Sequence, residues 1–222
     1  MRSKALRSIT MKRFLSLLAG VAAATAVYAA DHAPAVTGDP AKGRQIVSTV
    51  CFACHNIDGN STIVTNPKLA GQHPEYLFKQ MKNFKNTDGK PPERTSPVMN
   101  AMIMAYDEGQ MRDLAAFFAE QPRKGEVAKN PDSIEFGRKL YRAGDQSKGL
   151  PACAGCHGPT GAGIPAQYPQ ISGQFVEYTE AQLKAFRAGE RTNDLNKMMR
   201  MVAIKMTDVE IKAVSDYVAG LR

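Results

Sequence analysis

The sequence of 222 residues contains no tryptophan, and only 7% of its residues are aromatic. It also lacks any segment of useful length with the alternating apolar and polar pattern of a β-strand. Every convincing periodic segment is helical, which predicts an all-α fold. Because large apolar side chains are scarce, small helical units would have a thin core, and a further apolar component is expected to fill them.

Long hydrophobic runs are also missing, since the longest, residues 14–28, has 15 residues. A helix needs roughly 20 apolar residues to cross a bilayer, so we favour a cleaved segment over a permanent anchor. A basic stretch precedes this run and small residues come after it, which is typical of a secretory signal peptide, here residues 1–30. Cleavage after Ala29 and cleavage after Ala30 both fit. We therefore expect a periplasmic protein, in a compartment where disulfides persist.

No run of Lys or Arg exceeds two residues, although the formal net charge is +8. Five basic residues and no acidic ones leave with the predicted signal peptide, so 29 − 5 = 24 basic residues face 21 acidic ones, a net charge of +3. A mildly basic chain without a basic cluster gives no reason to expect a nucleic acid as partner.

The scarce cysteines and histidines are not scattered. All four cysteines and two of the four histidines lie in two pentapeptides, CFACH at 51–55 and CAGCH at 153–157. The segments downstream of the two pentapeptides also repeat. Residues 66–85 align with 168–187 at an offset of 102, and after a loop the offset becomes 100. Self-similarity of this kind indicates an internal duplication.

The duplication defines the predicted domains. A polar segment with Gly and two Pro, residues 120–133, joins the two halves and is interpreted as a linker. We therefore predict a first domain at 31–124 and a second domain at 125–222. Both are expected to be all-α domains of the same architecture.

Helix starts can be located from capping signals. Asp39 is a predicted N-cap, and Asp107 with Gln110, like Thr207 with Glu210, has the spacing of a capping box at the start of an amphipathic run. The two boxes align at an offset of 100, which places the last helix of each half in register. Helices are predicted at 40–50, 75–85 and 110–120, and at their counterparts in the second half.

Four interpretations compete for the Cys-x-x-Cys-His motifs. A redox dithiol of the thioredoxin type expects a strand and a helix around it, whereas the surroundings here are helical. A zinc site would need the cysteines of both halves and would leave the adjoining histidines without a role. A disulfide within one motif closes a ring too short to restrain much of the unfolded chain.

The remaining interpretation is covalent attachment of haem. Two thiols three positions apart reach the two vinyl groups, and the next residue meets the iron. Two such motifs in a duplicated, helical chain predict two haem c groups, each filling the core of its domain. His55 and His157 are the predicted proximal iron ligands. The predicted thioether attachments are at Cys51, Cys54, Cys153 and Cys156.

The sixth position of each iron decides the chemistry, because an open position binds a substrate and a filled one favours electron exchange. A second histidine is poorly supported. His32 lies just after the predicted cleavage site, and the counterpart of His73 in the repeat is Phe175. We therefore interpret His73 as a surface residue or one that supports the site indirectly.

Methionine is the better candidate for that position, although most methionines fill gaps in cores. Several lie in the two appropriate regions. In the register of the capping boxes, Met99 aligns with Met199, and no other methionine there has a methionine counterpart. We therefore predict Met99 and Met199 as the distal ligands, with Met102 and Met198 as the fallbacks.

Residues around the iron ligands share the same symmetry. A proximal imidazole needs an acceptor for its other ring N–H, and the carbonyls of Pro67 and Pro169 lie at matching distances after each histidine. The alternative is that these prolines merely end a loop. Arg94 and Arg191 are candidates to pair with haem propionates, with an exposed loop arginine as the alternative.

These motifs carry a family resemblance. Together with the duplicated CxxCH, the sequence has NPKLAGQ at 66–72, YPQISGQ at 168–174, FRAGERTND at 186–194 and the ending VSDYVAGLR at 214–222. Along nearly its whole mature length the chain resembles the dihaem cytochrome c4 family. The resemblance implies two cytochrome c domains packed together in the periplasm, with His/Met ligation at both irons.

The resemblance also implies a function. It suggests an electron carrier, not an enzyme, that passes electrons from a donor such as a quinol:cytochrome c oxidoreductase towards a terminal oxidase, in some members with peripheral membrane association. Each iron would cycle between Fe(II) and Fe(III). Two alternatives stay open: a dihaem subunit of a periplasmic dehydrogenase, such as a flavoprotein sulfide dehydrogenase, and a dihaem peroxidase with one open iron.

Overall fold

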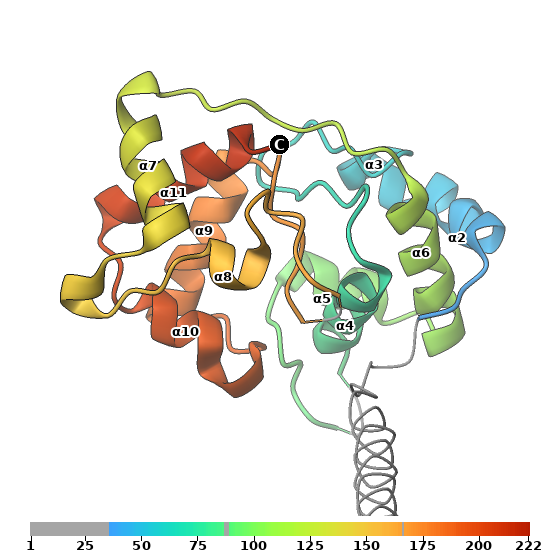
Figure 1. Cartoon of the computed structure of the whole chain (residues 1–222). Helices are drawn as coiled ribbons and strands as arrows, with labels where there is room; N and C mark the ends of the chain where they lie inside the picture. The colour runs from blue at the N-terminus through green and yellow to red at the C-terminus, as the bar shows by residue number, and fades with distance from the viewer. Residues whose placement is uncertain (1–35, 87–88, 166) are drawn as a thin grey trace, which may run out of the picture. The chain divides into compact units, whose positions relative to one another are not determined.

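The computed structural model describes residues 36–86, 89–165 and 167–222, and the predicted signal peptide lies outside them. Within these residues the chain forms helices joined by loops (Figure 1). No residue in these ranges belongs to a β-strand, and the isolated β-bridges there include Asp145 with Leu150 and Ile164 with Tyr168. The predicted all-α fold is therefore confirmed.

Each half contributes the same series of helices. In the first half they are α2 (Pro40–Ile46), a π-helical turn (Val47–Cys51), α3 (Phe52–His55), α4 (Pro74–Phe84), α5 (Pro97–Ile103) and α6 (Glu108–Glu120). In the second half they are α7 (Pro131–Ala143), a 3-10 turn (Gln146–Lys148), α8 (Ala154–His157), α9 (Val176–Ala188), a 3-10 turn (Leu195–Lys197), α10 (Met198–Ala203) and α11 (Asp208–Gly220).

The predicted helix starts are confirmed by their caps. The Asp39 carboxylate accepts hydrogen bonds from the first backbone N–H groups of α2. Both capping boxes form, Asp107 with Gln110 at the start of α6 and Thr207 with Glu210 at the start of α11. In each box a side chain satisfies an N–H group that the helix itself leaves unpaired.

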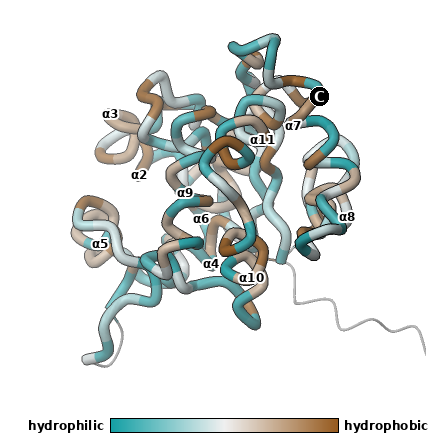
Figure 2. The backbone as a smooth tube through the Cα atoms, turned by 90° about the vertical axis from the view of Figure 1, so that its left-hand side faces the viewer, coloured by the Kyte–Doolittle hydropathy of each residue, from teal (hydrophilic) through white to brown (hydrophobic). Residues whose placement is uncertain are grey.

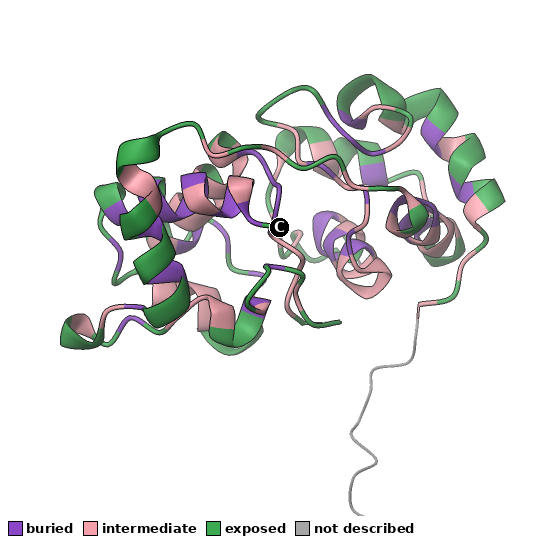
Figure 3. Cartoon of the chain, turned by 45° about the horizontal axis from the view of Figure 1, so that its top comes forward, coloured by how far each residue is buried: buried purple, intermediate pink, exposed green. Residues whose placement is uncertain are grey.

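The helices pack in the same way in the two halves. Helix α2 packs against α6 as α7 does against α11, and α4 packs against α6 as α9 does against α11. In α6 the buried positions recur at spacings of three and four residues, as in a helix with one face on a core. In α11 buried residues lie on all sides of the helix (Figure 3). The largest apolar cluster in the second half consists of Leu140, Tyr141, Leu150, Met206, Ile211, Val214, Val218 and Leu221.

Two glycines allow the closest helix contacts. A Cβ atom on Gly43 of α2 would lie 2.1 Å from the carbonyl oxygen of Asp113 in α6, and one on Gly137 of α7 would lie 2.3 Å from that of Ala213 in α11. Neither carbonyl can move without bending its helix. The crossing of the first and last helix of each half therefore requires glycine.

Replacing Gly43 by alanine should lower the free energy of unfolding by about 1–3 kcal/mol, because the added methyl group forces α2 away from α6. Denaturant titration followed by circular dichroism measures this. The matched control is Gly155→Ala, since a Cβ there meets no atom within 4 Å and the repeat counterpart of Gly155 is Ala53. Equal effects of the two substitutions would contradict the steric explanation.

The segment between α6 and α7 is held by both halves. The backbone N–H of Lys124 donates to Asn60 Oδ1 at 2.7 Å, and the N–H of Lys129 donates to Asp216 Oδ1 at 2.7 Å. The described residues accordingly form one compact unit. The predicted linker is thus an ordered connection.

None of the helices in the described ranges has the length and hydropathy of a membrane span. Apolar and polar residues mix along these helices (Figure 2).

Candidate haem-binding sites

The two motifs adopt the same local structure. Cys51 ends the π-helical turn and Cys54 with His55 lies in α3, while Cys153 is the N-cap of α8, which ends at His157. In one helical turn, residues three apart lie on the same side. Each motif thus presents two thiols side by side with an imidazole directly after them.

The zinc interpretation fails on geometry. Among the described residues, no group of three or more His, Cys, Asp or Glu side chains lies close enough to hold a metal ion. The shared zinc site would require all four cysteines to converge. No two of the four cysteines are joined in a disulfide.

The thiols also lack the character of a redox dithiol. Burial raises the pKa of Cys51 to about 11, and it raises the pKa of Cys153 to about 11 as well. A reactive dithiol needs a lowered pKa that produces thiolate at neutral pH. These two sulfur atoms therefore stay protonated at neutral pH in the protein alone.

The two histidines are buried and held identically. His55 and His157 are 7% and 8% exposed, and each Nδ1 lies 3.0 Å from a proline carbonyl oxygen, that of Pro67 or Pro169. A carbonyl only accepts, so Nδ1 carries the proton and Nε2 keeps a free lone pair. The prediction that these carbonyls orient the imidazoles is confirmed.

Burial favours the neutral form of both imidazoles. Burial lowers the pKa of His55 and that of His157. In each case the hydrogen bond to the proline carbonyl, that of Pro67 or Pro169, raises the pKa and so opposes part of this shift. A neutral imidazole with a protonated Nδ1 is the tautomer that binds iron through Nε2.

Backbone hydrogen bonds hold the loops that contain Pro67 and Pro169 in place. The carbonyl of Gly59 accepts from the N–H of Leu69 at 2.7 Å, and the N–H of Gly71 donates to Phe118 of α6 at 2.9 Å. Gly71 has a φ of +68°, which glycine adopts without strain. The equivalent bonds in the second half involve Gly161 and Gly173. Each motif histidine is therefore oriented by a loop that is itself tied to the last helix.

The predicted methionines occupy corresponding helices. Met99 is the third residue of α5, where it packs against the cluster of Phe84, Ile103 and Met111, and Met199 is the second residue of α10. The thioether of the fallback Met198 instead accepts a hydrogen bond from the Tyr168 hydroxyl at 3.8 Å. The fallback Met102 is exposed.

His73 forms a hydrogen bond away from the two motifs. Its Nε2 donates to the carbonyl oxygen of Ala162, in the other half, at 2.9 Å. This agrees with the interpretation of His73 as a residue that does not bind iron. His32, the other histidine outside the motifs, lies outside the described residues.

Arg94 joins the two halves through neutral groups. Its guanidinium donates to Gln80 Oε1 at 2.8 Å within the first half. It also donates to the hydroxyl of Tyr178 at 3.0 Å and to Gln182 Oε1 at 2.9 Å, both in the second half. The alternative of an exposed loop arginine is therefore wrong for Arg94.

Arg191 makes the equivalent contacts from the second half. It donates to Gln182 Oε1 at 2.9 Å in its own half, and to the hydroxyl of Tyr76 at 3.0 Å and Gln80 Oε1 at 3.2 Å in the first half. Arg191 is buried. Although burial alone would raise the pKa of Tyr76, the positive charges of Arg191 and Arg94 lower it.

The tyrosines and glutamines of this arginine network were not predicted from the sequence. A signal was present, since Tyr76 aligns with Tyr178 and Gln80 with Gln182 at the offset of 102. Repeat identity alone, however, does not distinguish a core residue from one that crosses between halves.

The arginine network has the composition of an anion site. Within the described ranges neither guanidinium pairs with a carboxylate, and the buried Nε2 of Gln80 has no hydrogen-bond partner. A buried cation is costly unless a group of opposite charge pairs with it, and a buried neutral donor needs a hydrogen-bond acceptor. The carboxylates of two porphyrins fit these groups, as the free Nε2 atoms of the histidines fit iron.

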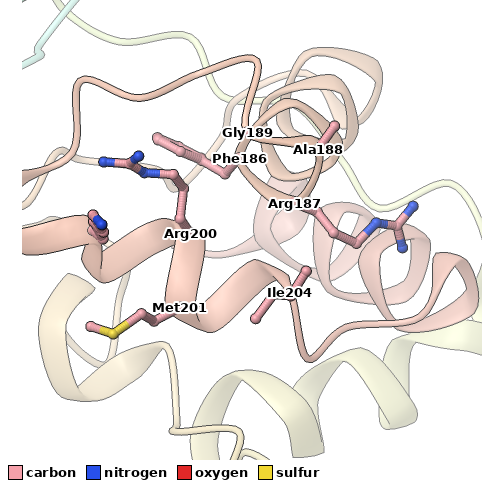
Figure 4. Close-up of a pocket in the computed structure, with 8 residues that line it drawn as sticks. Phe186, Arg187, Ala188, Gly189, Arg200, Met201 and Ile204 are labelled. Atoms are coloured by element: carbon pink, nitrogen blue, oxygen red, sulfur yellow. The ribbon is translucent and has the colours of Figure 1, made fainter.

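A shallow hollow of about 300 Å³ lies where α9 ends against α10 (Figure 4). Phe186 and Gly189 line it from α9 and its C-cap, and Met201 and Ile204 line it from α10 and its C-cap. Met201 and Ile204 are 55% and 65% exposed. The hollow therefore adds an apolar surface to the corner of the fold that carries Met199.

Comparison with known proteins agrees with this architecture. The family model for cytochrome c matches twice in tandem, at residues 40–121 and 134–222. A cytochrome c4 of Thiocapsa roseopersicina is 45% identical over 83% of this chain and 93% of its own. The chain belongs to the cytochrome c4 family. Its membership confirms the predicted tandem cytochrome c domains.

Two further similarities are informative. The crystal structure of reduced recombinant cytochrome c4 from Pseudomonas stutzeri superimposes with a TM-score of 0.79 at 38% identity, over 84% of this chain and all of the other. A thiosulfate dehydrogenase electron acceptor of Thiomonas intermedia is 35% identical over 77% of each chain. The cytochrome described here carries two covalent haem c groups and is an electron carrier, not an enzyme.

Proposed function

We propose that the protein is a periplasmic electron carrier that passes electrons towards a terminal oxidase. The observation that carries this is the identical setting of His55 and His157, each with Nδ1 bound to a proline carbonyl and Nε2 free. Two sites with the same ligand geometry would each accept and release electrons in the same way. We assign them to two domains, 31–124 and 125–222, whose boundary lies in the segment between α6 and α7.

In this proposal the chain binds each haem through thioether bonds to the porphyrin and through a ligand to the iron. The four motif thiols form the thioether bonds, namely Cys51, Cys54, Cys153 and Cys156. His55 and His157 bind the irons through Nε2. When bound, the haems supply one-electron Fe(II)/Fe(III) exchange, with methionine raising the reduction potential.

Met99 and Met199 are the proposed distal ligands. A distal ligand must approach from the face opposite the proximal histidine. Met198 is held by Tyr168, which precedes Pro169 and whose ring centroid lies 6.3 Å from that of His157, so this thioether belongs to the proximal side. Side chains of consecutive helical residues point in different directions, which leaves Met199 for the distal face.

The arginine network would join the two haems. Arg94 and Arg191 are buried or half-buried between the halves and reach groups in both, so propionates bound there would approach each other. Hydrogen bonds from fixed guanidiniums would also hold the two porphyrin edges at a constant separation. A fixed separation favours rapid electron exchange between the domains.

We propose redox proteins as the partners, a quinol:cytochrome c oxidoreductase as donor and a terminal oxidase as acceptor. The exposed apolar residues Met201 and Ile204 in the second half, and Met104 in the first, provide small surfaces for brief docking. Transient electron-transfer complexes typically use such small interfaces. Residues 1–30 would direct export, and peripheral membrane association would bring the carrier near both partners.

A second candidate is electron acceptance from a dehydrogenase. The 35% identical relative is a thiosulfate dehydrogenase electron acceptor, which favours a dehydrogenase of inorganic sulfur compounds over a flavoprotein sulfide dehydrogenase. The site residues are the same in both candidates. They differ only in the donor.

Rapid mixing separates these candidates. The reduced protein should be oxidised by membranes containing an active terminal oxidase, and cyanide should abolish this oxidation. The oxidised protein should be reduced faster by quinol with a quinol:cytochrome c oxidoreductase than by thiosulfate with a thiosulfate dehydrogenase. The opposite order of rates would support the dehydrogenase candidate. Prompt binding of carbon monoxide to the reduced protein would reveal an open iron and contradict His/Met ligation at both haems.

A further inference from the structure

Two buried glutamines cross between the halves next to the proximal histidines. Gln72 and Gln174 occupy the same position in the repeat and are 6% and 7% exposed. Each directs its side-chain amide into the other half. Neither takes part in the arginine network.

Gln174 binds both sides of the residue after Pro67. Its Oε1 accepts from the backbone N–H of Lys68 at 3.0 Å, and its Nε2 donates to the Lys68 carbonyl at 3.0 Å. The N–H of Lys68 and the carbonyl of Pro67 belong to one peptide group. That carbonyl is the acceptor for His55 Nδ1 at 3.0 Å.

Gln72 repeats the arrangement in the opposite direction. Its Oε1 accepts from the N–H of Gln170 at 2.9 Å, and its Nε2 donates to the Gln170 carbonyl at 2.8 Å. The N–H of Gln170 shares a peptide group with the Pro169 carbonyl, which binds His157 Nδ1. One peptide group thus separates each proximal histidine from a glutamine of the other half.

The hydrogen bonds from each glutamine affect the charge on the proline carbonyl as well as its position. When a peptide N–H donates to an acceptor, its carbonyl oxygen gains negative charge and becomes a stronger acceptor, so successive hydrogen bonds reinforce each other. A stronger acceptor at Nδ1 makes the imidazole a stronger donor at Nε2. A more basic axial ligand stabilises Fe(III) and lowers the reduction potential.

We propose that Gln174 and Gln72 are positioning residues that lower the reduction potential of the haem in the opposite half. Gln174 acts on the haem of His55, and Gln72 acts on the haem of His157. The inference rests on the proposed proximal ligands, and it makes each potential depend on the docking of the two domains.

A purely structural role predicts something different. If the glutamines only hold the halves together, their loss would weaken the interface and change both haems to a similar extent. A crosswise electronic role instead predicts a change that is concentrated at one haem, in the domain that does not carry the substitution.

The test is a redox titration of the holoprotein that resolves the two haems by NMR, comparing Gln174→Leu and Gln72→Leu with the unaltered chain. In Gln174→Leu, the ratio of reduced to oxidised iron at the His55 haem should rise about three- to tenfold at a fixed applied potential. Tenfold equals 59 mV for a one-electron couple. The His157 haem should change less than about twofold. Gln72→Leu should show the reverse pattern.

His73→Phe is the matched control. It removes the hydrogen bond from His73 to Ala162, which also crosses between the halves, and leaves both proline peptides untouched. It should change neither potential selectively. If Gln174→Leu does not fold, Gln174→Asn keeps the amide but shortens its reach, and the same crosswise pattern is expected.

Equal shifts at both haems, no shift, or a larger shift in the substituted domain would overturn the inference. The proposed ligation is checked separately on the unaltered protein. If its oxidised spectrum lacks the far-red methionine-to-iron band, the proposed function fails before any glutamine is replaced. An intact band with no crosswise shift would reject the role of the glutamines alone.

Discussion

Met99→Ala should remove the far-red methionine-to-iron band from one haem and leave it in the other. Loss of the thioether should also lower the reduction potential of that haem by a few tenths of a volt, since axial ligands set haem potentials over a range of roughly 0.8 V. Met99 packs against Phe84, Ile103 and Met111, so the substitution also removes some core contact. Optical spectra of the oxidised protein and a spectroelectrochemical titration measure both effects.

Met102→Ala is the matched control, because Met102 lies in the same helix and is exposed. It should leave both the band and the potentials unchanged. If Met102→Ala removes the band and Met99→Ala does not, the register of the capping boxes has identified the wrong residue. The corresponding pair in the second half is Met199→Ala with Met198→Ala as its control.

The double variant Cys153→Ser/Cys156→Ser should lose one of the two covalent haems and the fold of the second half. Cys153 packs against the apolar cluster of Leu140, Tyr141 and Ile211, where a haem attached to it would complete the core. Without this core the half relies on few large side chains, as the absence of tryptophan already indicates. Mass spectrometry measures the haem content, and the helical signal in circular dichroism should fall by roughly half.

Gly155→Ala serves as the control for this variant too, because it alters the same motif without removing a thiol. It should retain two haems and the full helical signal. The first half of the double variant should keep the far-red band of its own haem. A fully helical double variant would show that the second half folds without covalent haem and would contradict the proposed role of the haem in its core.

Local signals in the sequence predicted the longer helices well, whereas the short helices α5 and α10 were not predicted. Asp39, Asp107 and Thr207 cap helices because their side-chain oxygens accept from the next few N–H groups, and these bonds need no distant partner. The motif histidines and the prolines that orient them were also predictable, because the same short spacing occurs twice. The motif, the loop and the acceptor lie within one short stretch of chain.

Contacts between the halves could not be predicted in this way. Arg94 bonds to Tyr178 and Gln182, and Arg191 bonds to Tyr76 and Gln80, across sequence separations of 84 to 115 residues. Such pairs leave no periodic pattern, because their spacing depends on how two domains dock. The exposed alternative for these arginines was therefore reasonable on sequence alone, and the structure instead places them between the halves.

The number of haems, the duplication and the orientation of each motif histidine could be predicted from the residues alone, because these depend on short-range spacing and on a repeat. The contacts of Gln72 with Gln170 and of Gln174 with Lys68 could be found only from the way the two halves pack together. Each of these contacts joins a domain to the other through a peptide group, and a peptide group has no side chain whose identity could mark it in the sequence.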